Sequence, residues 1–160
     1  MTEAVMEVPG KAKDKIKVDK DNKTPTSVFT LTPSALPNED WPLVDVDENA
    51  VSSIEIEFIV DAKKTPIPAD YQSTLTVSLA ADSDWVFKGK GIEYGKKSDK
   101  NHEIATSVSE CKKLLALVIS YNNASGAGEE EADFVFTCKE KNNGNFDSQD
   151  PGIIVKRIPN

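Results

Sequence analysis

Short stretches of alternating apolar and polar residues recur along most of the chain, separated by Gly, Pro, Asn and Asp. In the clearest stretch, residues 53–60, every second side chain from Ile54 to Val60 is apolar, whereas Glu55 and Glu57 fall on the opposite side. A repeat of two residues is the period of a β-strand, whose side chains point alternately to the two faces of a sheet. The pattern therefore predicts antiparallel sheets that bury one face and expose the other.

Further stretches of this kind follow at short intervals, which is typical of all-β domains. Residues 113–121 are apolar on both faces, but their β-branched end favours a central strand over a buried helix. We expect an immunoglobulin-like antiparallel β-sandwich of about seven to nine strands, with a jelly roll or an open barrel as alternatives. The candidate strands, from which these seven to nine would come, are 27–31, 43–46, 53–60, 73–80, 84–88, 92–94, 103–107, 113–121, 133–139 and 152–158.

The apolar positions of these strands define the expected core. Its members are Phe29, Ile54, Ile56, Phe58, Leu75, Val77, Leu79, Leu115, Leu117, Ile119, Phe134 and Phe136.

Residues 1–26 differ from the rest of the chain because they are dense in charge and carry no aromatic side chain. Such a segment buries too little apolar area to offset the entropy lost on ordering. We therefore expect a mobile N-terminal arm over 1–26 and a single sandwich domain over 27–160. In the alternative, residues 15–18 add a strand to an edge of a sheet.

The charge of the chain excludes several partners. It carries 27 acidic against 19 basic residues, which gives a net charge of −8. Nucleic acids and anionic membranes attract proteins with a positive field, so we expect neither as a partner. No stretch reaches the roughly 18 apolar residues of a membrane span, and the first residues lack the pattern of a secretory signal. These features predict a soluble, cytoplasmic protein.

Residues that often carry chemistry are few. His102, the one histidine, lies in a polar stretch that is typical of a solvated loop rather than of a general base. Cys111 and Cys138 are expected to be free thiols in a reducing compartment, with a disulfide between them as the alternative. No nucleophile motif, cofactor fingerprint or complete set of soft metal ligands is present. We therefore predict no catalytic, cofactor-binding or metal-binding residues and no enzymatic activity.

Acidic loops are the remaining candidates for a metal. The stretch 45–49 opens like a calcium loop, but Ala50 and Ile56 occupy the glycine and bidentate-glutamate positions of the EF-hand, so that interpretation fails. If an ion binds, we expect Ca²⁺ at loops between strands, because oxygen ligands suit a hard cation. The oxygen donors would come from Asp45, Asp47 and Asn49 or from Asp147 and Asp150. The acidic run 129–131, followed by Asp133, is interpreted as a solvated strand entrance.

Three other features carry weak signals. The segment Lys88-Gly89-Lys90-Gly91 is basic and glycine-rich but lacks the ending of a phosphate-binding loop. Asn123 begins a glycosylation sequon, which has little meaning without secretion. Aromatic side chains stack on sugars in some sandwiches, although core and rim positions are the expectation here. The aromatic side chains in question are Trp41, Trp85, Tyr71, Tyr94 and Tyr121.

The C-terminal third resembles a known family. The stretch Phe134-Val135-Phe136-Thr137-Cys138, followed by Ser148-Gln149-Asp150-Pro151-Gly152-Ile153-Ile154-Val155, is similar to the DP-EP family, with Asp150-Pro151 after a strand and a turn. Members are small bacterial proteins of uncharacterised role. The resemblance implies an immunoglobulin-like sandwich and a bacterial source, and it implies no activity and no functional residue.

These observations favour a non-enzymatic binding or protein-interaction module, because the loops of sandwich folds usually serve recognition. Its partner would be another protein, or a second copy that associates through a sheet edge or face. A metal-dependent hydrolase that uses acids such as Asp45, Asp47, Asp147 and Asp150 is the alternative from another class. A structural or storage protein of bacterial or phage origin is a third.

Overall fold

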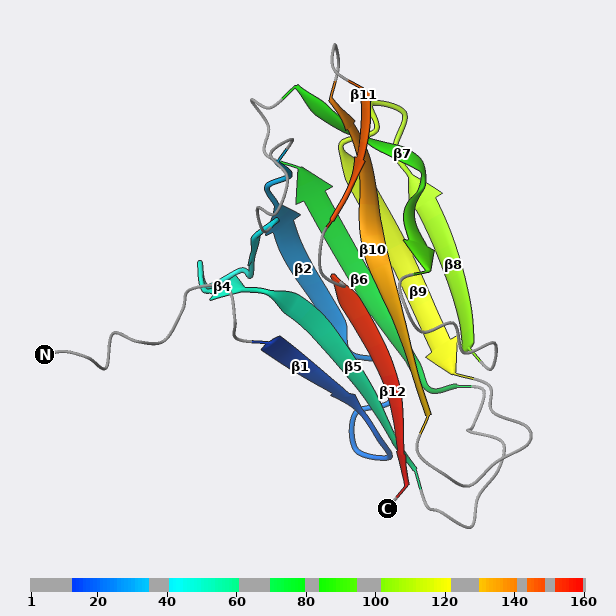
Figure 1. The fold of residues 1–160 in the computed structure, drawn as a ribbon. Helices are drawn as coiled ribbons and strands as arrows, with labels where there is room; N and C mark the ends of the chain where they lie inside the picture. Colours follow the sequence, from blue (N-terminus) through cyan, green and yellow to red (C-terminus); the bar gives the residue numbers. More distant parts are fainter. Residues whose placement is uncertain are drawn as a thin grey trace, which may run out of the picture.

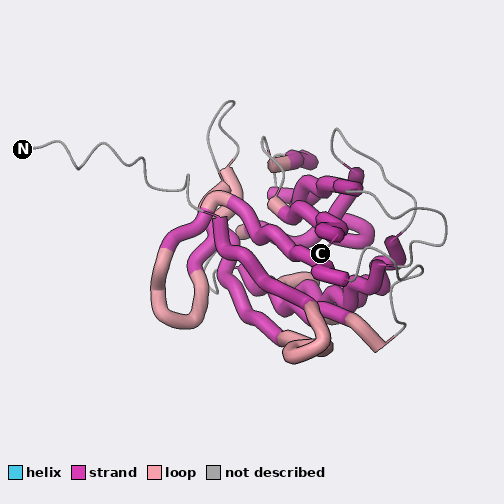
Figure 2. The backbone as a smooth tube through the Cα atoms, turned by 90° about the horizontal axis from the view of Figure 1, so that it is seen from below, coloured by secondary structure: helices cyan, strands magenta, loops and turns pink. Residues whose placement is uncertain are grey.

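Two β-sheets packed face to face make up the described part of the chain. The computed structural model describes residues 13–34, 41–60, 70–79, 84–94, 102–121, 130–140, 144–148 and 152–159, and every regular element in these ranges is a strand. Strands β5, β10 and β12 of one layer lie in front of β2, β6 and β9 of the other (Figure 1). In the view from below, the described chain consists of strands joined by loops and turns (Figure 2). The predicted all-β sandwich is confirmed.

In the first sheet β1, β5, β12 and β10 follow one another in this order. Strands β12 and β11 pair with successive parts of β10 along one of its sides, and β7 pairs with β10 along the opposite side. Its strands are β1 (Lys13–Val18), β5 (Ser53–Val60), β12 (Ile153–Pro159), β10 (Glu130–Glu140), β11 (Gly144–Asp147) and β7 (Trp85–Tyr94). The second sheet has the order β4–β3–β2–β6–β9–β8. Its strands are β4 (Ala50–Val51), β3 (Leu43–Val44), β2 (Thr26–Leu31), β6 (Gln72–Leu79), β9 (Leu114–Tyr121) and β8 (His102–Val108).

The sheets are mixed rather than antiparallel throughout. Strand β5 pairs in parallel with both β1 and β12, and β2 pairs in parallel with β6. Alternation of apolar and polar residues is the same in both kinds of pairing, so the sequence pattern did not separate them. The twelve strands of the described residues also exceed the expected number. Strands β3, β4 and β11 have two to four residues each, which is too short for a visible period.

The edge strand considered for residues 15–18 is present as β1. It pairs with β5 in a register that places Ile16 beside Ile56 and Val18 beside Phe58. Ile16 and Val18 are both buried, so this strand contributes to the core despite its charged neighbours. The sandwich therefore includes residues from Lys13 onward, and residues 1–12 of the expected arm lie outside the described part.

The core fills the space between the two sheets. Every residue expected there is buried, and Phe29, Phe58, Phe87 and Phe136 are its largest fully buried side chains. Aromatic side chains extend the core toward one end, where the ring centroids of Trp41 and Trp85 lie 5.8 Å apart and those of Trp85 and Phe146 lie 5.5 Å apart.

Most of the aromatic side chains considered for sugar stacking belong to this core. Trp41, Tyr71 and Trp85 are buried, whereas Tyr94 is half exposed. The side chain of Tyr121 lies outside the described residues. Of the described candidates, Tyr94 is therefore the aromatic residue with a ring available to a ligand.

Candidate functional site

A bulge in β7 shapes the most developed surface hollow. Trp85 and Phe87 are buried at odd positions of β7, whereas Ile92 is buried at an even position. Between the pairs Phe87–Cys138 and Ile92–Phe136, β7 has four residues and β10 has one, so β7 carries three extra residues. Gly89 and Gly91 make this possible because they adopt φ angles of 58° and 82°, which other residues rarely do. The two separate strands expected at 84–88 and 92–94 are therefore one bulged strand, and the basic segment Lys88–Gly91 forms its bulge.

The bulge is held from both sides. The Thr137 hydroxyl donates a hydrogen bond of 3.0 Å to the carbonyl oxygen of Lys88. Gly91 packs so closely on the second sheet that a Cβ atom there would lie 2.9 Å from the Leu115 methyl groups. The two sheets thus meet at Gly91, and the space between β7 and β8 opens beyond this contact.

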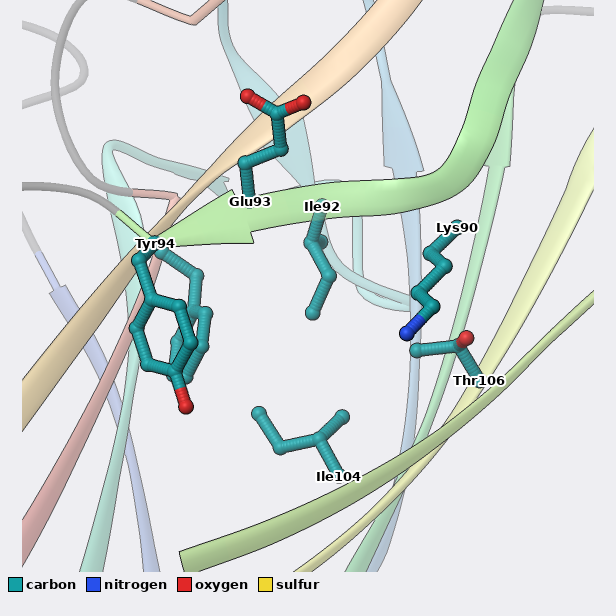
Figure 3. A pocket seen from close by; sticks show the side chains of 7 residues that line it. Lys90, Ile92, Glu93, Tyr94, Ile104 and Thr106 are labelled. Carbon is teal, nitrogen blue, oxygen red and sulfur yellow. The ribbon is translucent and has the colours of Figure 1, made fainter. Parts of the chain in front are cut away.

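That space is an open cavity of about 380 Å³ between the two edge strands. Figure 3 shows Ile92 and Ile104 pointing toward each other across it, with Lys90 above Thr106 at one end and Tyr94 at the other, while Glu93 points away. The rings of Tyr94 and Phe134 are in contact, with centroids 4.9 Å apart. Its described lining is Lys90, Ile92, Glu93, Tyr94, Ile104, Thr106 and Phe134.

The lining of the cavity combines apolar side chains with a few polar ones. The volume falls within the range of small-molecule sites, which are mostly apolar with a few polar groups that set orientation. Ile92 and Ile104 supply the apolar centre, Tyr94 an exposed aromatic ring, and Lys90 a cation. The described lining holds no nucleophile beside a base and no pair of facing acids, which are the usual parts of hydrolytic sites.

The histidine and cysteine candidates lie elsewhere. His102 begins β8, opposite Tyr121 of β9, and its side chain is outside the described residues. Both cysteines are free, as expected, so the disulfide alternative is not borne out. Burial raises the pKa of the Cys138 thiol to about 12, while a hydrogen bond with the Ser109 hydroxyl lowers the pKa of exposed Cys111. The two thiols therefore have opposite surroundings.

The acids considered for calcium serve a turn or lie apart. Asp45 Oδ1 accepts hydrogen bonds of 2.9 Å from the backbone N–H groups of Asp47 and Asn49, and these contacts lower the pKa of Asp45. Asp147 is exposed on β11 of the other sheet, and Asp150 and Glu129 lie outside the described residues. Within the described ranges, no group of three histidine, cysteine, aspartate or glutamate side chains is placed to hold a metal ion.

The outer face of the first sheet holds a cluster of ion pairs that alternation alone did not reveal. Glu55 and Glu57 lie outside the core, yet they are only 2% and 7% exposed. Lys156 Nζ lies 3.2 Å from Glu55 and 3.8 Å from Glu131, and Lys15 Nζ lies 3.8 Å from Glu55 and 3.9 Å from Glu57. Burial raises the pKa of Glu57, and so do the hydrogen bond and charge of Glu55, whereas the two lysines lower it.

Replacing Glu57 with glutamine is expected to stabilise the protein at neutral pH. The pKa of Glu57 in the fold lies above its ordinary 4.5, so its contribution to stability is full below pH 4.5 and is lost as the pH rises through the raised value. The advantage of Glu57→Gln should therefore shrink as the pH falls toward 4.5. Urea denaturation at both pH values measures it, with exposed Glu110→Gln as control; an equal advantage at both would contradict this assignment.

The chain matches a known protein family over most of its length. The sequence profile of the DP-EP family matches residues 12–157, which is nearly the whole chain and extends the resemblance well beyond its C-terminal third. The Asp150-Pro151 pair lies outside the described residues, but the following Gly152 is buried between β10 and β5. No curated protein sequence matches the chain. In the described part of the chain there is no helix long and apolar enough to cross a membrane.

Sequence reasoning named two members of the cavity, Tyr94 and Lys90, but for other chemistry. It missed Ile104 and Thr106, because the weak alternation of residues 103–107 does not indicate which strand of the other sheet lies opposite them. One signal was present in the sequence: the apolar positions change from odd to even across two glycines between Phe87 and Ile92. Such a change marks a bulge, and bulges often lie beside functional sites.

Proposed function

We propose that this chain, which belongs to the DP-EP family, is a non-enzymatic binding module and that the cavity between β7 and β8 is its binding site. The observation that carries the proposal is the arrangement of the lining, with an exposed aromatic ring, an apolar centre and a cation in sequence across one cavity. Cytoplasmic placement in a bacterium belongs to the same proposal; two free thiols suit a reducing compartment.

The lining points to a small ligand with an aromatic or apolar body and one anionic group. The half-exposed ring of Tyr94 offers a stacking surface, and Ile92 and Ile104 offer apolar contact on both sides of the body. Lys90 then lies where a carboxylate or phosphate of the ligand would meet an ammonium group. The overall charge of the chain is strongly negative and disfavours anions, whereas this exposed lysine gives the cavity a local preference for an anionic group.

A titration with phenylacetate, followed by amide chemical shifts, tests the proposal. A probe of this size is expected to bind with a dissociation constant of about 1 mM or below, from the usual free energy per ligand atom. Shifts should concentrate on residues 90–94 and 104–106, and uncharged phenylacetamide should bind more weakly. Shifts spread evenly over the surface, or none at saturating probe, would contradict the proposed site.

Replacing Lys90 with glutamine is expected to weaken phenylacetate binding several-fold, because an exposed ion pair contributes up to about 1 kcal/mol. Lys88→Gln is the matched control, since Lys88 is also exposed on the same bulge but is not among the described residues that line the cavity. The same titration measures both variants. An equal loss of affinity in the two would show that net charge rather than the cavity attracts the probe.

A further inference from the structure

The outer face of the second sheet carries no charge at any position with a described side chain. We call this the uncharged face; it consists of every second residue from Thr26 to Thr30, from Gln72 to Ser78, from Leu114 to Ser120 and from Ala105 to Ser107, together with Val44 of β3. In a chain with 29% charged residues, a surface of several strands without one is a strong departure. Glu103, opposite Ser120 in the register, marks its end on β8.

The face is regular as well as uncharged. Thr76 of β6 lies beside Val28 of β2 on one side and Ala116 of β9 on the other, and Ala116 lies beside Ser107 of β8. Short or β-branched side chains of this kind leave a flat surface. Val28 and Leu114, which are 49% and 41% exposed, are two of the large apolar side chains that the described surface leaves open.

The opposite outer face has the reverse character. On the first sheet the outward positions include Lys15, Glu55, Glu57 and Lys156, which are joined in ion pairs. Around the uncharged face, charges begin at its rim, with Asp45 and Asp47 after β3 and with Glu110 and Lys112 after β8. A centre without charge and a rim that carries it is the usual anatomy of a protein interface.

We propose that the uncharged face is an interface between two copies of this chain, packed sheet on sheet about a two-fold axis. The distribution of charge is the reason for proposing a second copy as the partner. Each molecule carries a net charge of −8, so two copies repel wherever charged surfaces approach within a Debye length of about 8 Å. A two-fold interface must be complementary to itself, and a face without charge meets its own copy with no like charges opposed.

The area of the face sets the expected strength. The face has 14 outward residues, each of which covers about 4.8 Å across the strands and about 6.6 Å along them, so it measures roughly 440 Å² on each partner. The two partners together would bury roughly 900 Å², which lies in the class of weak, transient interfaces below about 1,200 Å², and the polar hydroxyl groups reduce the apolar share further. We therefore expect a reversible dimer with a dissociation constant in the micromolar range.

Sedimentation equilibrium tests the proposal. Over protein concentrations from about 10 to 500 µM, which bracket the expected dissociation constant, the wild-type mass should rise from 17.5 kDa toward twice that value. Thr76→Lys places two ammonium groups near the centre of the interface and should weaken the dimer at least tenfold. Asn145→Lys, an exposed change on β11 of the other sheet, adds the same charge and should leave the dimer unchanged.

Each possible outcome either supports or overturns the proposed dimer. Circular dichroism at low concentration first establishes that both variants keep the wild-type fold. The proposal is supported if the wild type and Asn145→Lys form dimers and Thr76→Lys stays monomeric. Because Thr76→Lys lowers the net negative charge of the molecule, stronger repulsion between other parts of the two copies would not explain its monomeric state. A wild-type protein that stays monomeric would overturn it. Equal association of all three proteins would also overturn it, because this result would place the contact at an edge such as β8.

Discussion

Replacing Gly152 with alanine is expected to lower the free energy of unfolding by about 3 kcal/mol, the upper range for overpacking a core. An added Cβ would overlap the ring of Phe136, which is 1% exposed and has no room to move. The backbone has no freedom either, since Gly152 N–H donates to the Phe134 carbonyl oxygen and its own carbonyl accepts from Ile54 N–H, both at 2.8 Å.

Urea denaturation of Gly152→Ala measures this loss. Gly89→Ala is the control, because Gly89 has a positive φ of 58° with open space around it and should cost only about 1 kcal/mol. A double-mutant cycle with Phe136→Ala isolates the cause: alanine at position 152 should cost little once the ring is absent. A loss at Gly152 no larger than that at Gly89 would contradict the proposed overlap.

Replacing Lys156 with methionine is expected to cost about 2 to 3 kcal/mol, somewhat less than the loss of a fully buried ion-pair partner. Methionine keeps most of the volume of the lysine stem but removes the ammonium group 3.2 Å from Glu55, whose carboxylate is 2% exposed. Lys15 does not replace it, because its Nζ lies 3.8 Å away on a side chain that is 59% exposed. Lys17→Met, on the same face of β1 and exposed, is the control.

The pH dependence of this loss is a second readout. Burial lowers the pKa of Lys156, but the hydrogen bond and charge of Glu55, with the charges of Glu131 and Glu57, raise it above its ordinary 10.5 overall. A raised lysine pKa stabilises the fold fully below pH 10.5 and less as the pH rises through the raised value. The difference between wild type and Lys156→Met should therefore be constant near neutral pH and decline above 10.5. A difference that is independent of pH in that range would mean that packing, not charge, is lost.

The inward and outward positions of the strands followed from the sequence, whereas the pairing of the strands did not. Alternation placed Phe58, Val77 and Phe136 in the core correctly, because period two has one physical cause in every sheet. It carried no information about the parallel pairing of β5 with β1 and β12, which depends on long connections. Residues 15–18 alternate lysine with apolar side chains too briefly to distinguish an edge strand from a charged arm.

The candidate site was less predictable than the fold because it is made by two strands from different sheets. Tyr94 and Ile104 lie on opposite sides of the cavity, and the local alternation of residues in either strand does not indicate that the two strands face each other. Glu55 illustrates the same limit on the other side of the molecule: alternation predicted that it leaves the core, but only the three-dimensional arrangement shows that Lys156 covers it. Predicting ion pairs of this kind requires knowledge of the strand order.

The central claim is that the cavity between β7 and β8 binds a small amphipathic anion. Nuclear Overhauser effects between phenylacetate and a methyl-labelled sample of the protein test this claim most directly, because they report contact with named side chains. We predict that the ring protons of the probe show contacts with the methyl groups of Ile92 and Ile104, which face each other across the cavity. Contacts with Val28 or Leu114 on the uncharged face instead, and none with Ile92 and Ile104, would contradict it.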